Sequence, residues 1–173
     1  MQHIWTPWRY KYISSVQNKS ECIFCVAKEC PDNKDCFVLH KGIHNLIILN
    51  IFPYTNGHLM IAPFEHIASP AESNTEQLQE MVLLMTKCLR SLKEVYKPGG
   101  YNVGMNIGKC AGAGLSDHFH LHILPRWEGD TNFMASLAET RLVPEALDDT
   151  YEKLLSKFEE QAATGISMEE EIL

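Results

Sequence analysis

The sequence predicts a single α+β domain, in which an antiparallel sheet of about five strands packs against one long helix and a second helix follows at the C-terminus. Two patterns support this fold class. Five short apolar runs bounded by turn residues have the length of strands, and two longer stretches repeat apolar residues at helical spacing. The chain has 173 residues, 45% hydrophobic and 21% charged. One domain of this size buries roughly 70% of its unfolded surface.

The strand-like runs follow an aromatic and basic segment at residues 1–20, which we expect to be an extended strap over the core or at a subunit contact. Turn dipeptides, Lys41-Gly42 and Asn56-Gly57, separate the first three runs. The predicted strands cover residues 37–40, 44–50, 58–63, 101–107 and 118–124.

The long helix is predicted from a start signal, a period and a stop. Ser73 with Glu76 resembles a capping box, and apolar residues then recur at helical spacing from Leu78 to Tyr96, where Pro98 ends the pattern. The C-terminal helix is predicted to begin at Pro144. We expect the domain to span residues 1–163 and residues 164–173 to form an acidic tail.

Charge and hydropathy exclude two classes of partner. The net charge is −7, and residues 139–173 hold 10 acidic against 3 basic side chains, so the rest of the chain is neutral. It lacks the clustered Lys and Arg that bind a nucleic-acid polymer. The longest apolar run is far shorter than the ~20 residues of a membrane span, and no signal peptide precedes it. We therefore expect a cytoplasmic protein that binds no membrane.

Residues 118–122 read His-Phe-His-Leu-His. Because side chains alternate across a strand, His118, His120 and His122 are expected on one face. Two chemistries could use such a row: imidazole ligation of a catalytic metal, or attack by the central imidazole while its neighbours bind phosphate oxygens. The Cα atoms of His118 and His122 would be ~13 Å apart on an unbent strand, which favours the second chemistry.

Attack of His120 on phosphorus requires a neutral ring and donors for the phosphoryl oxygens, and the sequence has candidates for both. His120 must be neutral, with the attacking nitrogen unprotonated and the other N–H held by an acceptor, for which we expect a backbone carbonyl. Charge on the transferring phosphoryl group could be met by His122, by the amide of Asn106, and by N–H groups around Gly112-Ala113-Gly114. Missing side chains in that loop would let phosphate approach the backbone.

The histidine row resembles the His-φ-His-φ-His-φ-φ signature (φ apolar) of the histidine triad (HIT) family, nucleotide hydrolases and transferases that use a covalent histidine intermediate. The resemblance covers most of the chain and points to a bacterial branch related to diadenosine polyphosphate hydrolases and phosphorylases. It rests further on Trp5-Thr-Pro-Trp-Arg, Cys22-Ile-Phe-Cys25 and the stretches 49–58, 62–66 and 111–134.

The resemblance implies a role for each matching position. His120 corresponds to the nucleophile, His122 to a phosphate-side partner, and His58 to a supporting histidine behind the triad. Asn50 falls where family members bind the ribose, and Asn106 where they contact phosphate; both could instead form turns. The loop that holds Gly112 and Gly114 departs from the family pattern, because it is one residue longer and has no clear counterpart of the polar residue that the family often places before the triad. Ser116 is the candidate in this loop for a phosphate or leaving-group contact.

The cysteines suggest a metal site. Six cysteines without an export signal indicate a reducing compartment, where thiols are more often metal ligands or core residues than disulfides. Cys22 and Cys25 can give two thiolates to one tetrahedral ion. Zinc-containing family members complete the site with two histidines, which here are His66 and His118. In a second alternative the ligands are four thiolates, those of Cys22, Cys25, Cys30 and Cys36, and in a third the pair is free of metal.

The family resemblance implies a homodimeric enzyme that cleaves diadenosine polyphosphates or related nucleotides at the α-phosphorus. The phosphate chain leaves, and water or inorganic phosphate then releases the nucleotide from His120. Retention of a histidine at position 122 favours hydrolysis, because transferases of the family often have glutamine there. The alternatives are a phosphorolytic phosphorylase, a zinc hydrolase with the triad as ligands, and a nucleotide-binding sensor without activity. The substrate could carry magnesium; the zinc is expected to be structural.

Overall fold

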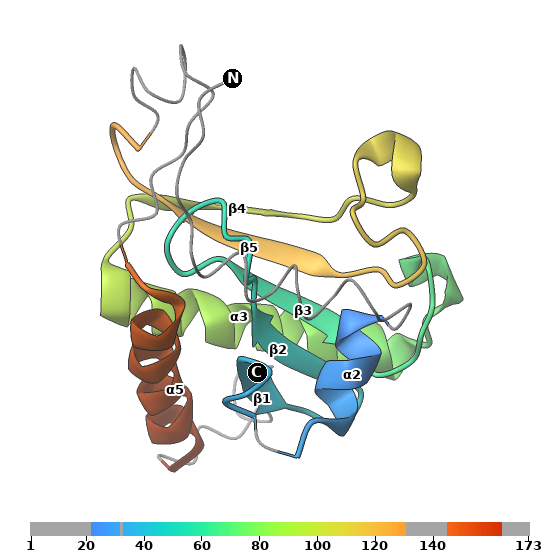
Figure 1. Cartoon of the computed structure of the whole chain (residues 1–173), viewed down its shortest axis with the longest axis horizontal. Coiled ribbons are helices and arrows are strands. Elements are labelled where there is room, and N and C mark those ends of the chain that lie inside the picture. Colours follow the sequence, from blue (N-terminus) through green and yellow to red (C-terminus); the bar gives the residue numbers. More distant parts are fainter. Residues whose placement is uncertain (1–21, 32, 131–144, 164–173) are drawn as a thin grey trace, which may run out of the picture.

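The computed structural model describes residues 22–31, 33–130 and 145–163. The expected strap at 1–20, the start of the last helix at Pro144 and the acidic tail lie outside these residues. Five strands form one antiparallel sheet with the order β1-β2-β3-β5-β4 (Figure 1). Among the described residues, no helix is long and apolar enough to cross a membrane.

The α+β prediction is confirmed: every predicted strand and both predicted helices are present. The strands are β1 (Val38–Lys41), β2 (Asn45–Leu49), β3 (Leu59–Pro63), β4 (Gly100–Gly104) and β5 (Leu121–Arg126). The helices are α2 (Ile23–Glu29), α3 (Thr75–Tyr96) and α5 (Leu147–Ala163), with short 3-10 turns η1 (Pro70–Glu72) and η2 (Lys109–Ala111). The short helix α2 was not predicted, since seven residues are too few to show a helical period.

The predicted start of α3 was wrong by one residue. Asn74, not Ser73, is the N-cap: its side chain accepts from the N–H of Gln77 at 2.8 Å, and the Gln77 side chain accepts from the N–H of Asn74 at 3.0 Å. Asparagine caps a helix as well as serine does, and glutamine can take the place of glutamate in the box. The sequence therefore offered two overlapping boxes, and the fold uses the second.

The start of the last strand was also wrong. The ladder of β5 begins at Leu121, so His118 and His120 precede the strand instead of lying in it. The cause is a different pairing: the N–H of Phe119 donates to the carbonyl of Ile67, in the segment that follows β3, at 2.8 Å. The triad thus spans the junction between an irregular segment and a strand.

The sheet is covered on both faces by different helices, as Figure 1 shows with α3 behind it and α2 in front. α3 and α5 pack on one face, against residues that include Ile47, Leu49, Leu59, Ile61, Leu121 and Ile123. α2 packs on the other face through Phe24 and Ala27, against Leu46, Ile48, Met60 and Ala62. His122 pairs with Met60 across the strands. Because cross-strand partners share a face, His122 lies on the α2 side.

A carboxylate from α3 fixes the turn between β1 and β2. The Glu80 oxygens accept from the N–H groups of Ile43 at 2.6 Å and His44 at 2.8 Å, and from the Asn45 amide at 2.7 Å. Burial favours a higher pKa for Glu80, but these hydrogen bonds together hold the pKa below its ordinary value. A Cβ at Gly42 would lie 2.5 Å from a Glu80 oxygen, so the turn needs glycine there.

Candidate active site and metal site

Four side chains predicted as metal ligands gather beside α2: Cys22, Cys25, His66 and His118. Their ligand atoms all lie within 4.8 Å of one another. The Cys22 Sγ is 3.2 Å from the His118 Nδ1, and the Cys25 Sγ is 3.3 Å from the His66 Nδ1. Ligand atoms around a tetrahedral zinc ion are about 3.3–3.8 Å apart, given Zn–N and Zn–S bonds of about 2.0–2.3 Å. The donor set and its spacing therefore suit zinc.

The ring of His118 is oriented for this site. Its Nε2 is 2.9 Å from the carbonyl oxygen of Pro63, and because a carbonyl can only accept, Nε2 carries the proton. The unprotonated Nδ1 then faces the two thiols. Metal-binding histidines commonly donate their other N–H to a carbonyl, which fixes the ring and raises its basicity as a ligand.

The all-thiolate alternative is wrong. Cys30 and Cys36 form a disulfide across the turn between α2 and β1, so neither offers a thiolate. This pair also departs from the expectation that the cysteines would remain ligands or core thiols. The two residues stand six positions apart and their Cα atoms are 6.5 Å apart, a separation that a disulfide can bridge.

His120 is held with one nitrogen ready to attack. Its Nδ1 is 3.0 Å from the carbonyl oxygen of His118, so the N–H donates there and Nε2 keeps its lone pair. This confirms the expectation that a backbone carbonyl is the acceptor. The residue is 7% exposed, and burial lowers the pKa of the ring despite this hydrogen bond. His120 is therefore a neutral imidazole at pH 7.

The proton of His122 is placed by a chain of hydrogen bonds that starts at the backbone. The Nδ1 of His58 accepts from the N–H of Tyr54 and from the Asn50 amide, both at 3.2 Å. Neutral His58 therefore carries its proton on Nε2, which lies 2.9 Å from the Nδ1 of His122. His122 accepts on Nδ1, and so its own proton is on Nε2.

The two rings therefore differ in what they present. His120 offers a lone pair on Nε2, and His122 offers an N–H on Nε2. The ring centroids of the two residues are 4.7 Å apart. A nucleophile beside a hydrogen-bond donor matches a phosphoryl group, whose phosphorus is attacked while its oxygens need donors.

Asn50 and Asn106, the two asparagines expected at the substrate, lie in different surroundings. The Asn50 side chain holds the local turn together, because its Oδ1 accepts from the N–H of Phe52 at 2.9 Å while its Nδ2 donates to His58. The turn-forming alternative for Asn50 is thus realised, and its ribose contact stays a prediction. Asn106 is half-buried between β4 and η2, and its phosphate contact likewise stays a prediction.

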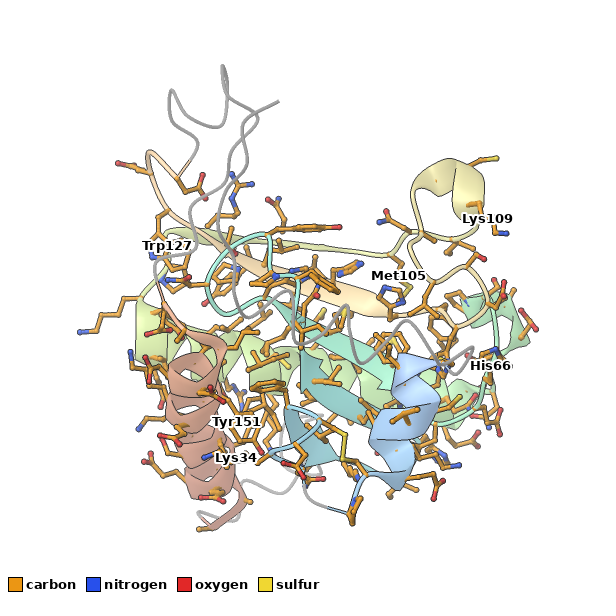
Figure 2. The ribbon with its side chains drawn as sticks, viewed as in Figure 1. Lys34, His66, Met105, Lys109, Trp127 and Tyr151 are labelled. Atoms are coloured by element: carbon orange, nitrogen blue, oxygen red, sulfur yellow. A yellow bond between two sulfur atoms is a disulfide. The ribbon has the colours of Figure 1, made fainter. Side chains whose placement is uncertain are left out.

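The loop before the triad has the backbone that its glycines predict. Gly112 ends η2 at a φ of +88°, where a side chain would be strained, and added Cβ atoms at Gly112 and Gly114 would meet nothing within 4 Å. The Ser116 hydroxyl is 2.8 Å from an Asp117 oxygen, to which it donates. The loop carrying Lys109 projects beyond the sheet in Figure 2. Phosphate binding by these residues remains a prediction.

Two residues of the site were not predicted. Phe24 packs its ring on His118 and His120, and the apolar position inside the Cys22–Cys25 motif could have signalled this. Tyr54 packs its ring on His58 and His122, with centroid distances of 4.9 and 6.2 Å. No sequence signal marks Tyr54, because its decisive donor is a backbone N–H.

A family model described as the HIT domain matches residues 32–129. The chain belongs to the HIT family. Among its HIT relatives, a protein named AP-4-A phosphorylase from Mycobacterium tuberculosis is 30% identical, over 93% of this chain and 86% of the relative. Adenosine 5'-monophosphoramidase hnt1 from Schizosaccharomyces pombe is 29% identical, over 79% of this chain and 97% of the relative.

The HIT fold is also found by structural comparison. A Zn-bound histidine triad family protein from Mycobacterium smegmatis has a TM-score of 0.65 and 25% identity, and the match covers 83% of this chain and 97% of that one. The resemblance inferred from the motifs is thereby confirmed. Because the relatives with named activities are enzymes, the chain is placed among the HIT enzymes.

The buried neutral histidines predict a loss of stability in mild acid. Burial, with a smaller effect of neighbouring histidines, lowers the pKa of His58 to about 3 and of His122 to about 4. The unfolded chain binds these protons near pH 6.5 but the folded chain only below pH 5. The free energy of unfolding should therefore fall as the pH drops from about 6.5 towards 4, by up to about 1.4 kcal/mol per pH unit for each histidine.

Urea unfolding at several pH values measures this slope. A His58→Gln variant lacks one titrating ring, and its stability should fall less steeply than that of the wild type between pH 6.5 and 5. Equal slopes for the two proteins would show that His58 titrates alike in the folded and unfolded states.

Proposed function

We propose that this HIT enzyme cleaves diadenosine polyphosphates or related nucleotides at the α-phosphorus through a covalent nucleotidyl intermediate on His120. One observation carries the proposal: the unprotonated Nε2 of His120 lies beside an N–H donor on His122, each fixed by the hydrogen bond of its other nitrogen. The likeness to a relative named AP-4-A phosphorylase supports the substrate class.

In the first step, Nε2 of His120 forms a bond to the α-phosphorus as the bond from phosphorus to the bridging oxygen breaks. The remaining phosphate chain leaves with that oxygen. The N–H of His122 meets the negative charge of the phosphoryl oxygens. The substrate contacts expected from the sequence complete this proposal: Asn50 at the ribose, and Asn106, Gly112, Gly114 and Ser116 at the phosphates or the leaving group.

In the second step, an oxygen nucleophile attacks the same phosphorus and the bond to His120 breaks. Water gives the nucleoside monophosphate and inorganic phosphate gives the diphosphate. Retention of His122 favours water, whereas the similarity to a phosphorylase favours phosphate. Phosphorolysis is therefore the second candidate.

The zinc-hydrolase alternative finds little support in the geometry. Of the triad, His118 alone belongs to the metal-ligand group found among the described residues. The Nδ1 of His120 is bonded to a carbonyl and the Nδ1 of His122 to His58. Among the described residues, the three rings therefore do not form one shared ligand group. Magnesium enters the proposal only as a counterion of the substrate phosphates.

Incubation with diadenosine tetraphosphate, with and without inorganic phosphate, tests the activity. Hydrolysis yields AMP and ATP, and phosphorolysis yields ADP and ATP, which chromatography separates. His120→Ala should lower turnover by at least about 10³-fold, because the covalent step is lost, while circular dichroism stays unchanged. If His120→Ala keeps an appreciable fraction of wild-type turnover, the covalent route is wrong; binding without any turnover in the wild type would support the sensor alternative.

The proposed metal is zinc, held in a structural site by Cys22, Cys25, His66 and His118. Purified protein should contain about one zinc ion per chain by elemental analysis. Cys25→Ser should release it, since one of four ligands is weakened, and should lower the melting temperature. Cys110→Ser is the matched control, because Cys110 is an exposed cysteine outside the ligand group. Equal zinc content in the two variants would contradict the assignment.

The proposed oligomer is a homodimer in which the β4 strands of two copies pair. β4 is an edge strand, and an edge presents unpaired N–H and C=O groups. Its Val103 is 42% exposed and Ile107, just beyond, is 49% exposed.

The proposed location is the cytoplasm.

Light scattering tests the dimer. The expected mass is twice the 19.7 kDa of one chain, and Val103→Lys should give monomers because a lysine on an edge strand disfavours its pairing with another strand. Val82→Lys, at an exposed position on α3, should leave the mass unchanged. A monomeric wild type would refute the proposed pairing.

A further inference from the structure

The nucleophile is held by contacts outside the sheet. The β5 ladder begins at Leu121, so the ladder does not fix His120. Its partner His122 lies within β5, opposite Met60, and is also bonded to His58. The two rings that must act together are therefore held by different means, and the orientation of His120 depends on neighbours from other elements.

The first of these neighbours is Phe24. It lies in α2 between the two cysteines of the metal-ligand group and is 1% exposed. Its ring centroid is 4.9 Å from that of His120 and 5.1 Å from that of His118. Because Phe24 lies between Cys22 and Cys25 in the chain, a metal that holds both thiolates also restrains the backbone that carries the Phe24 ring. A shift of the thiolates would move the surface on which His120 rests.

The second neighbour is the main chain of His118. Its carbonyl accepts the Nδ1–H of His120, while its ring faces the thiols with Nδ1 and donates from Nε2 to Pro63. A ligand held at its ring has little freedom to rotate its carbonyl. The metal-ligand group is thus connected to His120 by two contacts: the packing of Phe24 on its ring and the hydrogen bond to the His118 carbonyl. We call these contacts the two routes.

From this arrangement we infer that the metal site positions the nucleophile, and that Phe24 is the positioning residue through which α2 acts on the His120 ring. The inference rests on the proposed function, because it takes His120 as the attacking group. Loss of either route should change the rate of attack more than it changes substrate affinity. The donor His122, which the sheet holds, should be unaffected.

Phe24→Leu tests the first route, since leucine keeps the site apolar but removes the flat ring. The variant should lower kcat about ten- to a hundredfold with KM within about twofold, because small misplacements of reacting groups are costly. Its zinc content should equal that of the wild type. Phe64→Leu is the matched control: Phe64 packs on the same cluster of residues, and kcat should stay within about twofold.

A spectroscopic readout separates positioning from a general loss of stability. In protein labelled with 15N-histidine, His120 should show the pattern of a single tautomer with the proton on Nδ1. Phe24→Leu should broaden or mix this pattern while that of His122 remains. Zinc removal by a chelator should give the same change in the wild type, and adding zinc back should reverse it.

The outcomes are distinct. If His120→Ala remains active, the proposed function fails, whatever Phe24 does. If His120→Ala is inactive but Phe24→Leu keeps both wild-type kcat and the wild-type His120 spectrum, the role of Phe24 is refuted. If zinc-free protein stays folded with unchanged kcat and spectrum, the metal site does not position the nucleophile.

Discussion

The site depends on the hydrogen bond from the Nδ1 of His120 to the carbonyl of His118. Imidazole has two nitrogens, and committing one proton to a carbonyl that can only accept leaves the other nitrogen unprotonated. Burial adds to this effect, since it lowers the pKa of the ring and keeps it neutral. A ring in this state can act as a nucleophile, as the proposed function requires. The same bond ties the reactive ring to the residue whose own ring completes the metal-ligand group.

The hydrogen bond at Nδ1 likewise decides what Nε2 of His122 presents, but here Nδ1 accepts and Nε2 carries the proton. The backbone N–H of Tyr54 and the Asn50 amide occupy the Nδ1 of His58, which obliges His58 to donate and His122 to accept. The result is an N–H donor on a neutral ring, because burial keeps the pKa of His122 at about 4. In the proposed function this neutral donor, and not a charged imidazolium, meets the phosphate oxygens. Two hydrogen-bond chains, each starting at a backbone group, therefore assign opposite roles to neighbouring rings.

Elements with a regular apolar pattern could be predicted from the sequence, whereas features that depend on single tertiary contacts could not. Short apolar runs bounded by turn residues predicted the strands, and the 3.6-residue period predicted α3, because burial of apolar side chains selects both patterns. The strand prediction was wrong for residues 118–120. Their alternation is typical of a strand, but the backbone N–H of Phe119 donates to the carbonyl of Ile67 and not to a neighbouring strand. The proposed metal ligands His66 and His118 followed from the family pattern and not from spacing, since they stand 52 positions apart in the sequence. The position of Phe24 inside the cysteine motif is a weak local signal, whereas the contacts of Tyr54 are tertiary and have no local signal.

In the proposed mechanism, the tautomers of His120 and His122 prepare the first step and do not by themselves decide the second. Once the nucleotide is bonded to His120, water and phosphate attack the same atom, and the tautomers of the triad treat both alike. Water needs no binding site because its concentration is so high, whereas phosphate must be bound to compete. A phosphate site has to offer hydrogen-bond donors to a dianion. Gly108 and Gly112, which both have positive φ, flank the η2 turn, and a dianion can approach the backbone of this turn closely. In this proposal, the choice between hydrolysis and phosphorolysis depends on whether the loop before the triad binds phosphate, as well as on the residue at position 122.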